Sequence, residues 1–163
     1  MKTLHYYFAL SSPFAYLGHD ALARIAERDD VKVVCHPTRI GAVFAATGGL
    51  PPAKRSPQRQ AYRFAELRRW SARKALPLTL EPKHFPVDES LAAQCVLALQ
   101  DAGVSPMGFI GRAHRATWAE ERDLSDPAVV VDVLRADGQD AEVIVARAQD
   151  PATIKAYDDG TQA

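Results

Sequence analysis

The stretch TLHYYFALSSPFAYLGHDALARIAERDDVKVVC, residues 3–35, decides the fold class of this chain. Its opening segment, Thr3 to Leu10, is rich in aromatic residues and too short for a typical helix, so it predicts a buried strand. Ser12 followed by Pro13 is typical of a helix start, because the hydroxyl accepts from an orphan amide and proline suits the first turn. Val31 to Cys35 predicts a second strand. Strand, helix and strand in about 35 residues predict a βαβ unit with a right-handed crossover.

The helix between these strands repeats apolar residues at helical spacing before Asp29 and Asp30 end it. Its predicted apolar face consists of Phe14, Leu17, Ala21, Leu22 and Ile25. We expect this face to pack against the rest of the protein.

From about Arg39 onward the pattern is helical, with proline and glycine between the segments. We expect helices over 40–47, 58–75, 89–102 and 141–148 and an extended segment over 77–82. Three more helices should begin at the cap-plus-proline pairs Ser105-Pro106, Asp126-Pro127 and Asp150-Pro151. No later segment predicts a strand. Two parallel strands do not make a stable sheet alone, so either the sheet is completed elsewhere or strands are missing.

Composition places the chain among ordinary globular proteins. Its 163 residues are 47% hydrophobic and 25% charged, with 20 basic and 20 acidic side chains, which favours one domain with an insertion. No apolar run approaches the roughly 18 to 20 residues that span a bilayer, so we expect a cytoplasmic protein without membrane contact. Cys35 and Cys95 are too far apart for a zinc cluster or a CxxC pair, and we expect two buried free thiols.

A basic segment stands out against the balanced charge. Between Pro51 and Pro77 there are eight basic residues and one acidic residue, so this segment could face an anionic ligand. Four of its arginines, at spacings that are typical of a solvated helix face, are Arg59, Arg63, Arg69 and Arg73. Aromatic residues are not interleaved as a stacking platform, and we therefore expect no nucleic-acid partner.

Ser12 is the main candidate for chemistry. A hydroxyl at a helix N-terminus stabilises anions such as thiolates, by about 1.5 to 3 kcal/mol through its hydrogen bond and about 0.3 to 1 through the dipole. Together they could lower the pKa of a bound thiol by one or two units from about 8.5. The alternative from the residues alone is that Ser12 only caps the helix.

Five motifs in order resemble one family: YYFALSSPFAYLG (6–18), IGAVFAATGGLPP (40–52), AYRFAELRRWSARKALPL (61–78), HFPVDESLAAQCVLAL (84–99) and RATWAEERDLSDPAVV (115–130). The chain resembles the 2-hydroxychromene-2-carboxylate isomerases and the related kappa-class glutathione transferases, of the DsbA-like thioredoxin superfamily. The resemblance implies an α/β thioredoxin-like fold with a βαβ start (1–39) and a large all-helical insertion (40–125). Helices over 126–163 would lead back to an incomplete thioredoxin-like domain that lacks its C-terminal strands. Three explanations stay open: a truncated product, a fragment, or a protein whose sheet a partner chain completes.

The resemblance also implies a function: glutathione-dependent ring opening and cis–trans isomerisation in aromatic catabolism. Ser12 would be the catalytic residue and would hold the sulfur of the glutathione cofactor. The substrate, a small carboxylate derived from an aromatic compound, would contact Phe44, Lys54, Arg55, His84 and Asp88. No metal is implied, and a homodimer stays open.

Three positions depart from the family pattern, namely Gly49, Gln58 and Asp88. An ionised Asp88 would repel a substrate carboxylate. Two alternatives therefore stay open: a kappa-type transferase of unknown substrate, and a non-catalytic homologue that acts as a binding or scaffold chain. A dithiol oxidoreductase is disfavoured, because it would need a redox cysteine in place of Ser12.

Overall fold

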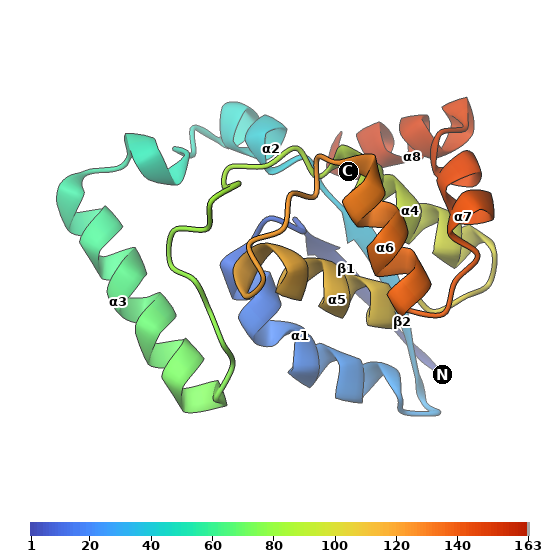
Figure 1. The fold of residues 1–163 in the computed structure, drawn as a ribbon, viewed down its shortest axis with the longest axis horizontal. Helices are drawn as coiled ribbons and strands as arrows, with labels where there is room; N and C mark the ends of the chain where they lie inside the picture. The colour runs from blue at the N-terminus through green and yellow to red at the C-terminus, as the bar shows by residue number, and fades with distance from the viewer. Residues whose placement is uncertain (163) are drawn as a thin grey trace.

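The structure, a computed structural model, describes residues 1–162 as a small sheet surrounded by helices (Figure 1). The elements are β1 (Lys2–Phe8), α1 (Pro13–Ala26), β2 (Val31–Pro37), α2 (Ile40–Thr47), the 3-10 turn η1 (Pro52–Lys54), α3 (Pro57–Lys74), α4 (Ser90–Asp101), α5 (Met107–Trp118), α6 (Pro127–Ala136), α7 (Ala141–Ala148) and α8 (Pro151–Gln162). The predicted α/β class with a βαβ start and a largely helical remainder is confirmed. The division into 1–39, 40–125 and 126–163 stays a prediction.

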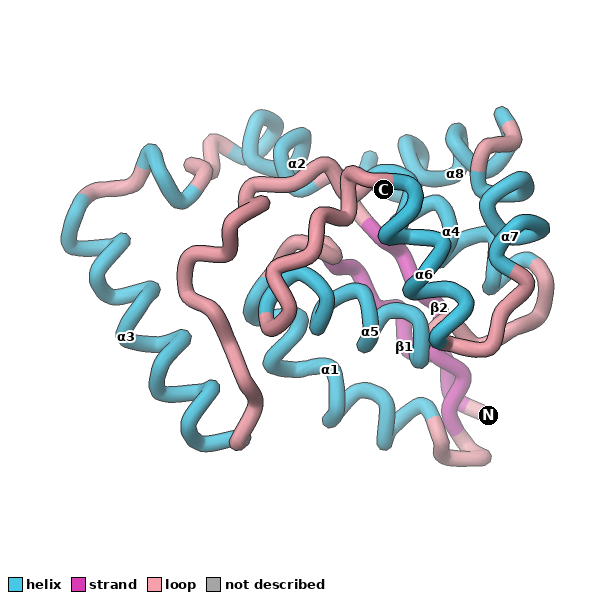
Figure 2. The backbone as a smooth tube through the Cα atoms, in the orientation of Figure 1, coloured by secondary structure: helices cyan, strands magenta, loops and turns pink. Residues whose placement is uncertain are grey.

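The sheet has two parallel strands, and no third strand occurs within residues 1–162 (Figure 2). The register runs from Lys2 opposite Val31 to Phe8 opposite Pro37. The first strand ends two residues earlier than predicted, and the second continues two residues further.

Helix α4 provides packing and hydrogen-bond partners for β2, which has only one neighbouring strand. Its apolar sequence is buried and packs against β2, as the pattern predicts for a central helix. The amide of Gln100 substitutes for a neighbouring strand, because its Oε1 accepts from the backbone N–H of Cys35 at 2.8 Å and its Nε2 lies 3.5 Å from the carbonyl oxygen of Cys35. A helix therefore covers one edge of β2.

The predicted apolar face of α1 is wrong in part. Phe14 is 47% exposed and Ile25 is 38% exposed, whereas Tyr16 and His19 are buried beside Leu17. The reason is the position of α5, which packs along α1 and places the ring of His114 near both buried aromatic side chains. The helix therefore turns a mixed aromatic face inward and leaves Phe14 at a cavity.

Most of the predicted helix bounds and N-terminal caps are confirmed. Helices 40–47 and 141–148 have the predicted bounds, and the carboxylate of Asp126 accepts from the N–H of Ala128 at 2.8 Å. The prediction for Ser105 is wrong, since α5 begins at Met107 with Pro106 in the capping position and no side-chain cap. Proline there has no hydroxyl to offer the first amides.

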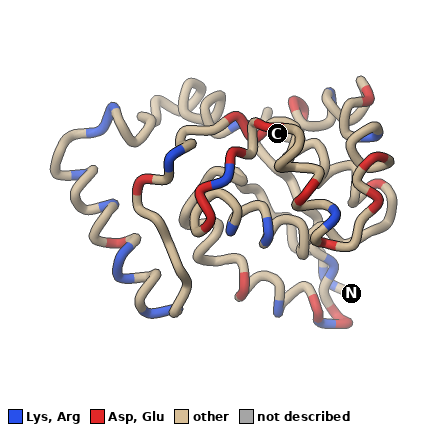
Figure 3. The backbone as a smooth tube through the Cα atoms, in the orientation of Figure 1, with Lys and Arg blue, Asp and Glu red and all other residues tan. Residues whose placement is uncertain are grey.

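Helix α3 stands at one end of the molecule, joined to β2 through α2 and η1 (Figure 1). Most of its charged side chains are basic (Figure 3), and it contacts the body of the protein at α1. None of the helices in residues 1–162 combines the length and apolar character that crossing a membrane requires.

Candidate functional site

A cavity of about 690 Å³ lies where β1 gives way to α1, a size that suits a small molecule. Its wall is largely aromatic, with Tyr6, Tyr7, Phe8, Phe14, Phe44 and Phe85 among the lining residues. Ser11 and Ser12 face it from the start of α1. Among the lining residues only Arg55 and Arg63 carry charge, so the cavity favours an apolar body with an anionic group.

Ser12 is held at the N-terminus of α1 by the local structure that its sequence predicts. Its backbone is extended, with φ −83° and ψ 119°, and Pro13 occupies the first helical position. Its Oγ accepts from the N–H of Ala15 at 3.2 Å, which leaves the hydroxyl proton free to donate. A half-buried donor at the positive end of a 14-residue helix is suited to an anion.

Arg55 and Arg63 bring two guanidinium groups to the wall of the same cavity. Arg55 follows η1, donates from Nε to the carbonyl of Leu50 at 2.8 Å, and lies 5.8 Å from the ring centre of Phe44. Arg63 comes from α3 and lies 5.9 Å from the ring centre of Phe85. Burial, and then the charge of Arg55, lower the pKa of Arg63.

Neither arginine forms an ion pair with a carboxylate in the part of the chain that the structure describes. Two neighbouring cations without a counter-charge repel each other, and an anionic ligand would relieve that repulsion. The pair is therefore chemically suited to a carboxylate.

The structure brings together three of the six predicted site residues. Ser12, Phe44 and Arg55 all line the cavity. Lys54 belongs to η1, is exposed, and is not among the lining residues. His84 and Asp88 are likewise absent from the wall.

His84 and Asp88 have local partners instead. Nδ1 of His84 lies 3.3 Å from a carboxylate oxygen of Asp123. Asp88 accepts from the N–H and the Oγ of Ser90 at 2.9 and 2.6 Å, and these hydrogen bonds lower its pKa. Asp88 thus serves the first turn of α4 rather than the cavity.

Sequence reasoning missed two residues around the cavity. Arg63 was expected on a solvated helix face, but it is half-buried and lines the wall. The excess of basic residues between Pro51 and Pro77 indicated a site for an anion, but the spacing of the arginines favoured an exposed helix face. Glu89 is buried behind the cavity and accepts a hydrogen bond from the backbone N–H of Ser11; no sequence pattern pointed to it.

The cysteines are free and buried, as predicted. Burial raises the pKa of Cys35 and of Cys95 to about 12. Neither thiol is among the residues that line the cavity. No group of three or more metal-ligating side chains occurs within residues 1–162.

Comparisons with known proteins agree with this architecture. A family model described as a DSBA-like thioredoxin domain matches residues 3–163. A 2-hydroxychromene-2-carboxylate isomerase of Sphingobium xenophagum is 28% identical over 153 residues, which cover 93% of this chain and 76% of that protein.

Several solved structures are similar in fold. A structure of 2-hydroxychromene-2-carboxylate isomerase has a TM-score of 0.76 at 21% identity and covers 99% of this chain and 78% of its own. The cytosolic disulfide reductase DsbM of Pseudomonas aeruginosa has a TM-score of 0.72 at 18% identity, over 99% of this chain and 77% of its own. DsbM was also solved with glutathione, and that structure has a TM-score of 0.67.

Proposed function

Because the chain belongs to the DSBA-like thioredoxin family, we propose that it is a glutathione-dependent isomerase of the 2-hydroxychromene-2-carboxylate type. Its substrate would be a small carboxylate derived from an aromatic compound. The observation that carries the proposal is the position of Ser12, whose hydroxyl lies at the N-terminus of α1 on the wall of a largely aromatic cavity. The similarity to the Sphingobium xenophagum isomerase favours this reaction over others of the fold.

The residues of the cavity fit glutathione as a cofactor. The wall offers a hydroxyl donor at a helix N-terminus and two unpaired guanidinium groups, and no lining residue is acidic. Ser12 would hold the sulfur, and the arginines are suited to carboxylates. When bound, glutathione supplies a sulfur nucleophile that can be released unchanged.

The chain's own residues then have distinct tasks. Ser12 donates to the sulfur anion, which is worth about 1.5 to 3 kcal/mol for a charged acceptor. Arg55 and Arg63 bind the substrate carboxylate. Phe44 and Phe85 exclude water from the same space, which strengthens both interactions. We assign no role in binding to Lys54, His84 or Asp88, since they lie outside the wall.

A disulfide reductase of the DsbM kind is the less favoured function. The first helix begins with Ser11-Ser12-Pro13 in place of a cysteine. The two cysteines are buried, and their raised pKa keeps them as unreactive thiols at neutral pH. A cytoplasmic location, which is given for DsbM, stays part of our proposal.

The test is Ser12→Ala, measured with 2-hydroxychromene-2-carboxylate at saturating glutathione. We expect turnover to fall by about 10- to 100-fold, the equivalent of one charge-assisted hydrogen bond. Asp140→Ala is the matched control, since the Oδ1 of Asp140 accepts from the N–H of Val143 at the same 3.2 Å at the start of α7. Each variant loses one helix cap, at about 1 kcal/mol of stability, but only Ser12→Ala should lose activity.

Equal turnover in Ser12→Ala and the control would refute the catalytic role. A glutathione titration separates the proposal from the scaffold alternative. Millimolar or tighter binding that weakens in Ser12→Ala supports the enzyme, and no binding by the folded chain supports the scaffold.

A further inference from the structure

Glu89 is a buried carboxylate that no step above uses. It precedes α4, is 7% exposed, and accepts a hydrogen bond from the backbone N–H of Ser11. Ser11 lines the cavity and is the neighbour of Ser12 along the chain. Glu89 therefore holds the turn that presents the Ser12 hydroxyl.

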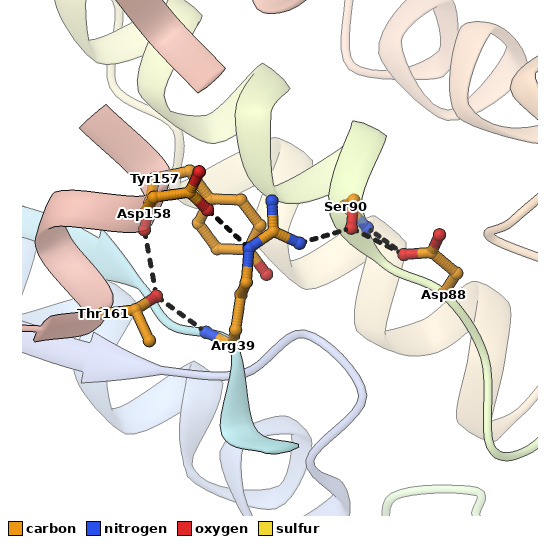
Figure 4. A network of polar contacts seen from close by, with 6 residues as sticks. All are labelled: Arg39, Asp88, Ser90, Tyr157, Asp158 and Thr161. Atoms are coloured by element: carbon orange, nitrogen blue, oxygen red, sulfur yellow. Dashed lines mark hydrogen bonds and ion pairs between the residues drawn. The ribbon is translucent and has the colours of Figure 1, made fainter. Parts of the chain in front are cut away.

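No cation neutralises Glu89 within residues 1–162, where none of the ion pairs includes it. Arg39, which binds the side chain of Ser90, the residue after Glu89, is engaged by other groups (Figure 4). Its Nε donates to Asp158 at 2.7 Å and its Nη1 to the hydroxyl of Ser90 at 2.9 Å, while its guanidinium lies 4.2 Å from the ring centre of Tyr157.

The titratable groups that interact with Glu89 bring it no positive charge. Asp88, one residue earlier, is acidic and disfavours the charge of Glu89. Tyr157 on α8 is neutral because burial, and then the charge of Glu89, raise its pKa. On the side of α5, His114 is neutral and donates to the carbonyl of Leu10.

The balance of these effects raises the pKa of Glu89. Burial is the largest cause, and the charge of Asp88 acts in the same direction. Hydrogen bonds from Ser11 and from the backbone of Leu10 oppose it without cancelling it. A carboxylate so placed is easily driven to its neutral form when another negative charge arrives nearby.

Such a charge arrives when an anion binds beside Ser12. Two negative charges close to the Ser11–Ser12 turn would repel each other, and the burial of Glu89 weakens the screening by water. The protein can avoid this cost by protonating Glu89, because burial has already raised the pKa of this carboxylate.

We propose that Glu89 is a positioning residue of the Ser12 site that takes up one proton when glutathione binds there as its thiolate. This inference rests on the proposed function. The protons balance: one leaves the thiol as the sulfur becomes anionic, one joins the carboxylate of Glu89, and none is exchanged with the buffer. The hydrogen bond from Ser11 to the carbonyl oxygen of the neutral acid keeps the turn in place.

The test is the pH dependence of glutathione affinity in wild type and in Glu89→Gln. Glutamine keeps an oxygen acceptor for the N–H of Ser11 but cannot take up a proton. Across about pH 6 to 8, below the ordinary thiol pKa near 8.5, wild-type affinity should stay level. In Glu89→Gln the affinity should rise about tenfold per pH unit, because one proton is then released to the buffer.

Two controls separate this role from a structural one. Asp101→Asn removes an exposed carboxylate at the other end of α4 and should behave as wild type. S-methylglutathione has a sulfur that cannot ionise, so its affinity should show no difference in pH dependence between wild type and Glu89→Gln. Calorimetry of wild type in two buffers of different ionisation enthalpy should find no net proton exchange, a readout that needs no variant to fold.

The outcomes are distinguishable. If wild type binds no glutathione at all, the proposed function fails and this inference with it. If wild type binds glutathione but its affinity rises about tenfold per pH unit, as in Glu89→Gln, only the role of Glu89 is overturned. The role of Glu89 would also be overturned if wild type and Glu89→Gln differed in the pH dependence of their affinity for S-methylglutathione.

Discussion

Ser12 and Arg63 illustrate how far single residues can be interpreted from the sequence. The cap of Ser12 could be predicted because it depends on three neighbouring residues, and the structure has the expected bond to Ala15. The exposure of Arg63 was predicted wrongly, because its environment is made by a distant segment. The loop after α3 brings Phe85 within 5.9 Å of its guanidinium, and nothing in the spacing of α3 encodes that contact.

Arg63 provides the first prediction at this scale. In Arg63→Met the apolar stem is retained and the charge is lost, so the substrate carboxylate loses one charge-assisted partner worth about 1.5 to 3 kcal/mol. We expect KM to rise by about 10- to 100-fold with little change in kcat. Steady-state kinetics with 2-hydroxychromene-2-carboxylate would measure both.

The control for this change is Arg59→Met, one helical turn earlier on α3, where the side chain is exposed. It should leave KM near the wild-type value. A methyl ester of the substrate should show no penalty in Arg63→Met. An equal rise in KM for the acid and its ester would contradict an electrostatic role for Arg63.

At the scale of elements, local chemistry set most helix bounds. Proline at the first position and an acidic cap predicted the start of α6 correctly, and αL Gly48 ends α2 where the sequence suggested, with φ 72°. The inward face of α1 was harder, because hydrophobicity alone does not rank Tyr16 and His19 above Phe14. Their burial depends on α5, which approaches from a part of the chain about 90 residues away.

The contact between α4 and β2 leads to a second prediction. Gln100→Leu should destabilise the protein, since the N–H of Cys35 would lose the acceptor that lies 2.8 Å away. Leaving a buried donor unpaired costs about 1 to 3 kcal/mol. For a chain of this size each kcal/mol lowers Tm by about 2 to 4 °C. Urea unfolding would measure the free energy of unfolding of Gln100→Leu. Gln58→Leu, a change at an exposed residue of α3, is the control. If Gln100→Leu lost no more stability than the control, the edge of β2 would need no hydrogen-bond partner.

At the scale of the whole molecule, a two-stranded sheet is held by what packs around it. The sequence pattern predicts the two strands and no others. It does not predict which helices pack against them. That information lies in contacts between distant segments, such as Gln100 with Cys35 and His114 with Leu10. The stability of the sheet is therefore inseparable from that of α4 and α5.

His114 makes this dependence measurable as a function of pH. The side chain is fully buried, with Nδ1 donating to the carbonyl of Leu10 at 2.9 Å. Burial, and then the charge of His19, lower the pKa of His114 to about 3. In the unfolded chain the same group has a pKa near 6.5. Between these values the unfolded state binds a proton that the folded state does not, so stability is lost as pH falls through this window.

We expect the free energy of unfolding to decrease, from about pH 6.5 downward, with a slope that approaches 1.4 kcal/mol per pH unit from His114 alone. In His114→Gln the amide can still donate to Leu10, but no proton is gained on unfolding, so that contribution to the slope should vanish. Urea unfolding between about pH 6.5 and 5 lies within this window, and the difference in slope between wild type and His114→Gln isolates the contribution of His114. Thr117→Val, a change at a buried polar residue one turn further along α5, should lower stability equally at each pH and keep the wild-type slope. A wild-type slope in His114→Gln would mean that His114 is not held neutral, and the tight packing of α5 against the end of β1 would then have to be revised.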